Sequence, residues 1–415
     1  MTPKTVFAAL AAGLALLAVT ASPMRPQETP AGPRTQEAAP PSVQVAVGVY
    51  NGAQFVRGLT RADFELLENG EPQKIEALYE VDRNAVTRQE GNAAAAPVTA
   101  RRFYLLFQLI DYNARIADAL RYFFTNALLP GDSLYVQTPM KTYRLTPEAL
   151  AQRPREVLAK EMDNIVRKDI NQGNLLYRSL VRELRRIVGG LEGLNPVAGG
   201  DEASDTETSE LGVEQLLNMY RDSLTKFETL RAFDQDKVLG FAQGLKKQDG
   251  RKLVFFIYEQ EFRPEISPQM INALIDNNQD KQNVIDAVHE LFQIYHQNIS
   301  LDAARIAQAY CDSSADFNLL FMAKTPERIG GITMREQSDV LFRVFSQVAK
   351  ATGGFIETTQ NPLTAIRDGL GAAEYYYLLT YVPSSATKNA GFKTIAVKVK
   401  DKNYKVLNRR GYISG

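Results

Sequence analysis

The sequence predicts an α/β protein, in which an open, mostly parallel sheet with helices on both faces is inserted in a small β-sandwich formed by both chain ends. Two observations lead to this fold class. In the middle of the chain, apolar runs typical of buried strands alternate with helical patterns. At both ends, apolar and polar residues alternate as they do in strands with one buried face, and no helical pattern accompanies them.

The composition indicates a globular, soluble chain without a strongly charged face. The 415 residues are 45% hydrophobic and 23% charged, which leaves room for two or three domains. Lys and Arg together number 48, as do Asp and Glu. A balanced charge does not favour binding to a phosphate backbone, so nucleic acid is not expected as a partner.

The first 21 residues are typical of a signal peptide. Lys4 precedes an apolar run from Val6 to Val19, and small residues around Ala21 suit cleavage there. The run is shorter than the roughly 20 apolar residues that a membrane-spanning helix needs. We therefore expect an exported protein, periplasmic or secreted, with no transmembrane segment in the mature chain. Residues 22–41 are rich in proline and polar residues and predict a linker.

Residues 42–83 predict an N-terminal β unit. Alternate valines from Val43 to Val49 lie on one side of a strand that ends at Asn51-Gly52, a favoured turn pair. Two further strands, Phe64–Glu68 and Lys74–Val81, flank a turn at residues 68–71. Residues 84–100 are rich in alanine, glycine and polar residues and predict a linker.

Residues 101–373 predict the α/β domain. Its expected strands are Phe103–Ile110, Ser133–Gln137, Leu253–Tyr258, Phe317–Ala323 and Phe355–Thr358. Its expected helices include Leu175–Val188, Val213–Thr229, Met270–Ile299 and Asp339–Ala351. The connection at about 195–300 is longer than two neighbouring strands require, so it predicts a helical insertion. Its apolar stripe would pack on the sheet or offer a partner surface.

Residues 374–415 predict strands that pair with the N-terminal β unit. Tyr375, Tyr377, Leu379 and Tyr381 alternate with other side chains, and lysines alternate with apolar residues in "FKTIAVKVK". These strands have one apolar face and no helix to cover it. The N-terminal unit has the same need, so we expect the two chain ends to meet.

Four stretches together resemble exported bacterial proteins with a von Willebrand factor type A (VWFA)-related domain. They are "GLTRADFELLENGEPQKI", "LLPGDSLYVQT", "ATGGFIETT" and the tyrosine-rich tail from "YYYLLTYVPSS" to the Gly-Tyr near the end. The resemblance spans nearly the whole mature chain and implies a von Willebrand factor A-like, Rossmann-like α/β domain. It also implies a ligand-binding face at the carboxyl ends of the strands, where ligands of open α/β sheets are generally bound.

Members of this family that bind a divalent cation use an Asp-x-Ser-x-Ser loop, a threonine and a later aspartate. The positions that match them in this chain are Asp111, Asn113 and Arg115, then Asn174, then Glu259. Only the first aspartate is kept, and the guanidinium of Arg115 cannot coordinate a cation. The resemblance therefore implies a degenerate metal-ion-dependent adhesion site, in which Arg115 forms an ion pair with Asp111 or Glu259. The alternative is a Mg²⁺ ion held by Asp111, Asn113 and Glu259.

No catalytic residue is predicted. The sequence contains neither a Gly-x-Ser-x-Gly elbow nor a phosphate-binding loop, and Cys311 has no assigned base partner. We expect a noncatalytic recognition or adhesion-type protein that binds a protein or glycan at the cell envelope, with no cofactor. The alternative is a structural or assembly component of the envelope that acts through its helical insertion, and a hydrolase is less favoured.

Overall fold

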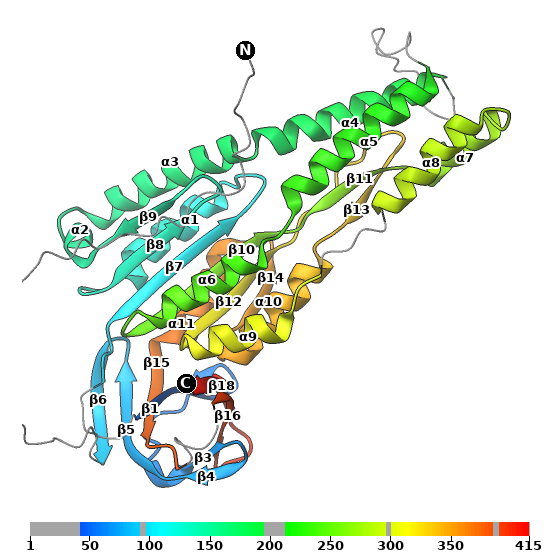
Figure 1. The fold of residues 1–415 in the computed structure, drawn as a ribbon. Helices are drawn as coiled ribbons and strands as arrows, with labels where there is room; N and C mark the ends of the chain where they lie inside the picture. The colour runs from blue at the N-terminus through cyan, green and yellow to red at the C-terminus, as the bar shows by residue number, and fades with distance from the viewer. Residues whose placement is uncertain (1–41, 92–96, 195–211, 296–299, 385–389, 415) are drawn as a thin grey trace, which may run out of the picture.

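The computed structural model describes residues 42–91, 97–194, 212–295, 300–384 and 390–414. Figure 1 shows three parts in a row: a β unit, a central sheet covered by helices, and a helical arm that extends from it. The predicted signal peptide (1–21) and proline-rich linker (22–41) lie outside the described residues. No helix among the described residues is long and apolar enough to cross a membrane.

The central sheet has six strands in the order β14-β12-β10-β7-β8-β9. Their bounds are β7 (Arg101–Gln108), β8 (Ser133–Gln137), β9 (Thr142–Leu145), β10 (Arg251–Glu259), β12 (Ala315–Met322) and β14 (Ile356–Thr359). The first five strands of this order run parallel, whereas β9 is antiparallel to β8. Most of β10 is buried, because helices cover both sides of it.

The predicted fold class is wrong, because antiparallel pairing dominates this chain. Ten strand pairs among the described residues are antiparallel, whereas four are parallel. The central sheet is itself mixed. The architecture is therefore mixed α/β with mostly antiparallel sheets rather than an open, mostly parallel, Rossmann-like sheet. Four of the antiparallel pairs, β1-β2, β3-β4, β5-β6 and β8-β9, are hairpins, in which a short turn can connect only antiparallel neighbours. Four others pair strands from the two chain ends in the β unit.

Helices pack on both faces of the central sheet. One face is covered by α1 (Arg115–Tyr122), α3 (Arg155–Gly173) and α11 (Pro362–Glu374), and the other by α6 (Gln235–Lys246), α9 (Ala303–Asp312) and α10 (Asp339–Thr352). A short helix, α2 (Pro147–Ala151), follows β9, and a π-helical turn (Phe123–Ala127) follows α1. Side chains of β7 alternate between the two cores: Phe103 and Leu105 enter the first, and Tyr104 enters the second.

The arm has its own apolar core. It consists of α4 (Leu175–Leu194), α5 (Val213–Arg231), α7 (Pro268–Asn277), α8 (Gln282–Tyr295) and the antiparallel ribbon of β11 (Phe262–Ile266) and β13 (Ile332–Glu336). The predicted helix Met270–Ile299 is two helices, because the chain turns at Asn278, whose side chain donates to Leu274 O. Residues 296–299 lie outside the described part. The arm begins at α4, before the predicted start of the insertion at about 195.

Strands from both chain ends are hydrogen-bonded to each other in the β unit. One sheet has the order β17-β1-β15-β5-β6, with β2 beside β1, and the other has the order β18-β16-β3-β4. The strands are β1 (Val43–Asn51), β2 (Gln54–Phe55), β3 (Phe64–Glu68), β4 (Glu71–Gln73), β5 (Ile75–Asp82), β6 (Ala85–Gly91), β15 (Tyr375–Tyr381), β16 (Gly391–Val399), β17 (Lys405–Asn408) and β18 (Gly411–Ser414). Residues 85–91, assigned by the sequence to a linker, thus form β6.

The two sheets share one core, which includes Val45, Leu66, Tyr377 and Ile395. A one-turn 3-10 helix (Arg61–Asp63) precedes β3. Asn69 and Gly70 join β3 to β4, and both have positive φ angles (50° and 84°). This is the conformation that an Asn-Gly pair adopts readily in a tight hairpin.

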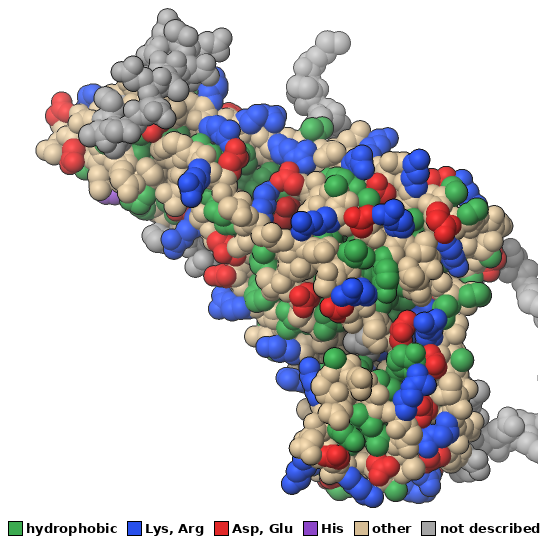
Figure 2. Space-filling view, turned by 180° about the vertical axis from the view of Figure 1, so that it is seen from behind, with side chains coloured by type: hydrophobic (Ala, Val, Ile, Leu, Met, Phe, Trp, Pro, Cys, Tyr) green, Lys and Arg blue, Asp and Glu red, His purple; other side chains and the backbone are tan. Residues whose placement is uncertain are grey.

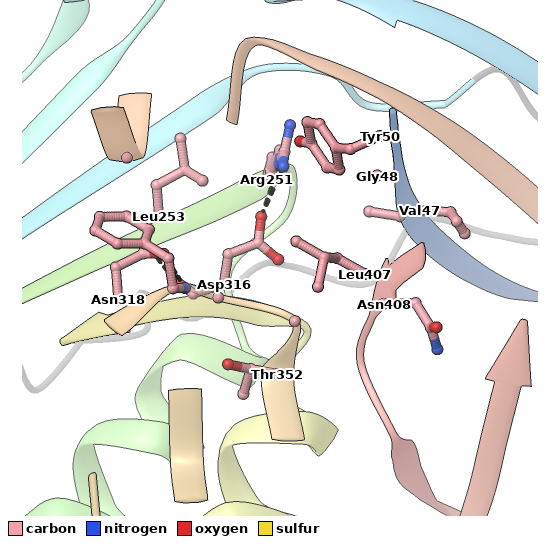
Figure 3. Close-up of a pocket in the computed structure, with 15 residues that line it drawn as sticks. Val47, Gly48, Tyr50, Arg251, Leu253, Asp316, Asn318, Thr352, Leu407 and Asn408 are labelled. Carbon is pink, nitrogen blue, oxygen red and sulfur yellow. Dashed lines mark hydrogen bonds and ion pairs between the residues drawn. The ribbon is translucent and has the colours of Figure 1, made fainter. Parts of the chain in front are cut away.

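The β unit and the central sheet meet at an ion pair between Arg251 and Asp316 (Figure 3), whose closest N–O distance is 2.8 Å. The guanidinium also lies 3.9 Å from the ring centroid of Tyr376 in β15. A hollow of about 40 Å³ beside this pair has room for little more than bound water. Because its main charged groups neutralise each other, we interpret this junction as structural.

A second ion pair, fully buried, fixes the start of the central sheet. Arg101 in β7 contacts both carboxylate oxygens of Asp132 at 3.1 and 2.5 Å and also donates to Ala127 O. Asp132 accepts from the Leu129 backbone N–H. The two side chains are 2% and 0% exposed, so neither charge has water as an alternative partner.

We expect Asp132→Ala to lower the free energy of unfolding by about 3–5 kcal/mol, because it leaves the Arg101 guanidinium buried without its counter-charge. Urea denaturation measures the loss. The double variant Arg101→Met with Asp132→Leu removes both charges and should lose less than the single variant. An Asp132→Ala loss below about 1 kcal/mol would show that the pair does not anchor the sheet.

Candidate functional site

The carboxyl ends of three parallel strands form an open cleft. Asp111 follows β7, Glu259 ends β10 and Lys324 follows β12, and these strands are neighbours in the sheet. The cleft has a volume of about 610 Å³, and these three side chains line it together with Arg115 at the start of α1. The sheet order therefore brings charged residues from distant parts of the sequence to one edge.

Glu259 holds the first loop in place. Its Oε2 accepts hydrogen bonds from the backbone N–H groups of Ile110 (2.7 Å) and Asp111 (3.0 Å). The side chain is only 12% exposed. Burial raises the pKa of Glu259, an effect that Lys324 and the two amide donors oppose.

Lys324 supplies a positive charge between the two carboxylates of the site. Its ammonium group contacts Asp111 Oδ2 and lies 3.7 Å from Glu259 Oε1. Its backbone N–H donates to the side chain of Gln260 at 2.9 Å, and Gln260 N donates to Met322 O, so the loops after β10 and β12 are tied together. Arg178 of α4 adds a second positive charge, 3.3 Å from Asp111 Oδ1.

Arg115 does not form the ion pair with Asp111 or Glu259 that the sequence predicted. Its guanidinium donates to Gln360 O at 3.3 Å, and the ion-pair partners of Asp111 are Lys324 and Arg178. Its backbone N–H donates to Asn113 Oδ1, so Asn113 forms an Asx turn just before α1. Arg115 is the first residue of α1, and the helix directs the Arg115 side chain along the rim of the cleft. The guanidinium therefore reaches the loop before α11 rather than Asp111.

Asn174 supports the loop rather than offering an oxygen to the cleft. It follows the last residue of α3, and its Nδ2 donates to Leu109 O and to Ile170 O, both at 2.8 Å. The structure thus brings Asp111, Asn113, Arg115 and Glu259 to the cleft, whereas Asn174 lies behind it and fixes the end of β7.

These residues do not fit a divalent cation. The ammonium group of Lys324 already lies against both carboxylates, and the amide oxygen of Asn113 is used by a backbone N–H. Mg²⁺ needs near-octahedral oxygen ligands, which this set does not provide. Nowhere in the described parts of the chain do three or more His, Cys, Asp or Glu side chains form a group that could hold a metal ion.

Sequence reasoning missed Lys324 and Arg178. Lys324 could have been found, because "LLFMAKT" places it directly after an expected strand, and carboxyl ends of neighbouring parallel strands meet at one edge. Arg178 gave no such signal, since the direction of α4 relative to the sheet is not encoded in any motif.

The cleft suits the recognition of a charged group. It offers the ammonium of Lys324 and the guanidinium of Arg115 beside the carboxylate of Asp111, which is 49% exposed. An incoming carboxylate could replace Asp111 as the partner of Lys324, and charge-assisted hydrogen bonds of this kind are among the stronger ones in proteins. No Ser, Cys or His is among the described residues that line the cleft.

Comparisons with known proteins do not identify the chain. No family model matches its sequence, and no curated protein matches it either. Among solved structures, it is similar to the human COPII-coat protein Sec24c, with 7% sequence identity and a TM-score of 0.29. The match covers 77% of this chain and 44% of that chain, and at this TM-score we draw no conclusion from it.

We expect the midpoint of thermal unfolding to be the same with Mg²⁺ or Mn²⁺ as with EDTA, because Lys324 occupies the position a cation would need. Lys324→Ala should cost about 0.5–1 kcal/mol, since the ion pairs are partly exposed. Lys160→Ala, which removes an exposed lysine of α3, is the matched control. A rise in the wild-type midpoint with Mg²⁺ that EDTA reverses would contradict the account.

The raised pKa of Glu259 predicts a pH dependence. A carboxyl group whose folded-state pKa lies above the unfolded value favours folding when protonated, and this contribution is lost as the pH rises through that interval. Glu259→Gln removes the titration while keeping an oxygen for the two amides. The free energy of unfolding of Glu259→Gln relative to wild type should therefore increase as the pH rises from about 4.5 to neutrality. Urea denaturation at several pH values measures it, and a flat difference would contradict the assignment.

Proposed function

We propose that this chain is a noncatalytic, exported recognition protein that binds a protein partner, or a glycan, through the cleft at Asp111, Glu259 and Lys324. The observation that carries the proposal is the placement of Lys324. Its ammonium group stands where the VWFA resemblance expects a metal, so a partner's carboxylate would meet a fixed organic cation instead of Mg²⁺. The site is then a degenerate adhesion site that works without a metal supply.

The arrangement of charges supports recognition by local pairs. On the face seen in Figure 2, acidic and basic side chains are interspersed rather than gathered by sign. A partner would thus be selected by the few charges inside the cleft, not by a long-range field. The export part of the proposal rests on residues 1–21, which lie outside the described part.

The arm supports a second candidate function, that of an assembly component of the envelope. Phe292 of α8 is 39% exposed, and Leu175 and Leu176 at the start of α4 are 61% and 46% exposed. Large apolar side chains at such exposure can make contacts with another protein. Phe292 is not among the residues that line the cleft, whereas Leu175 and Leu176 lie just before Arg178, which contacts Asp111. Phe292 is therefore the position that distinguishes the two candidates.

A photocrosslinking experiment in the native envelope tests the proposal. A benzoyl-phenylalanine at the exposed cleft residue Thr325 should capture a partner, whereas the same group at Lys160 on α3 should not. Lys324→Glu should reduce the Thr325 adduct by about tenfold, because reversing the charge repels the partner's carboxylate.

Lys160→Glu is the matched charge reversal and should leave the adduct unchanged. Mass spectrometry identifies the captured molecule. Capture from Phe292 alone, unaffected by Lys324→Glu, would favour assembly through the arm and overturn recognition at the cleft.

A further inference from the structure

A second hollow, which we call the α6 pocket, lies beside the helices that cover the other face of the sheet. Its volume is about 560 Å³, within the range of pockets that hold small molecules. Phe233, Val238 and Phe241, from α6 and the segment before it, form one wall. Leu106 of β7 together with Phe256 and Tyr258 of β10 forms the opposite wall.

The pocket exists because α6 covers only part of this face. Tyr104 and Leu106 of β7 and Tyr135 of β8 point to this side, and Leu106 and Tyr135 remain half-buried. Phe241 of α6 meets Tyr104 edge to face at 5.8 Å, and Tyr104 stacks on Tyr135 at 4.7 Å. Phe241, which lines the pocket, is thus held against the aromatic side chains of the sheet.

One polar group of the wall formed by β7 and β10 has no hydrogen-bond partner among the residues that the structure describes. The Tyr258 hydroxyl is fully buried, and Ser338 lies near it without hydrogen-bond geometry. Ser338 Oγ instead accepts from the Glu261 backbone N–H at 2.7 Å. A buried hydroxyl without a partner costs free energy that a ligand could recover by hydrogen bonding to it.

The charged residues of the pocket are already neutralised. Arg231 is 5% exposed and contacts Glu261 at 3.1 Å and Glu228 at 3.3 Å. At the rim, Lys237 and Asp234 form a pair with each other at 3.2 Å. An anionic ligand would meet an arginine whose charge two carboxylates already balance, so the charges favour an uncharged ligand.

We infer that the α6 pocket binds an uncharged aromatic small molecule with one hydrogen-bonding group, which pairs with the Tyr258 hydroxyl. The aromatic walls bury the rings, and the hydroxyl orients the polar group. This site is separate from the cleft of the proposed function and does not depend on it.

Fluorescence titration with N-phenyl-1-naphthylamine tests the inference, since this uncharged probe carries two aromatic units and one N–H donor. We expect saturable binding at one site per chain. The sulfonated analogue 8-anilinonaphthalene-1-sulfonate has the same rings and a negative charge, and it should bind at least about tenfold more weakly. Equal or tighter binding of the sulfonate would overturn the assignment of an uncharged ligand.

Variants locate the binding site. Val238→Trp fills the wall and should weaken the probe by at least about tenfold, whereas Gln243→Trp, at an exposed position of the same helix, should leave it unchanged. Tyr258→Phe removes a hydroxyl that has no partner, so the chain should still fold, and probe binding should weaken about fivefold. Lys324→Ala should have no effect. Equal binding to both tryptophan variants, or no saturable binding to the wild type, would overturn the inference.

Discussion

The ammonium group of Lys324 beside the carboxylates of Asp111 and Glu259 is the interaction on which the candidate site depends. Glu259 also accepts two backbone N–H groups from the loop after β7, so one carboxylate positions that loop and faces the cation. Two acidic groups at one sheet edge would repel each other without a positive charge between them. Lys324 supplies that charge from the chain itself.

Two other charged contacts keep the cleft at the end of a rigid sheet. The buried pair of Arg101 and Asp132 fixes the start of β7. Arg251, paired with Asp316, joins β10 to the β unit through its contact with Tyr376. These contacts hold β7, β10 and β12 at their amino-terminal ends, whereas the cleft lies at their carboxyl ends. The relative positions of Asp111 and Glu259 are thereby kept fixed.

The sequence was informative where a local pattern determines the outcome. Asn69-Gly70 marked a hairpin turn that the structure contains, and the strand at Ser133–Gln137 has the expected bounds. The sequence did not show whether two strands pair in parallel or antiparallel, because for strands far apart in the chain this depends on the path of the connection between them. The predicted fold class was wrong for this reason. In the site, Arg115 falls at a position of the family's motif, yet the direction of its side chain is determined by α1. Lys324 acts across 213 residues of sequence, and only the sheet order shows it.

A crystal structure of the protein grown with Mn²⁺, with an anomalous difference map, shows directly whether a metal ion or the Lys324 ammonium group lies between the two carboxylates. We expect no manganese peak between Asp111 and Glu259 and the Lys324 ammonium group in that position. A manganese ion coordinated by these two carboxylates, with Lys324 turned away, would contradict it.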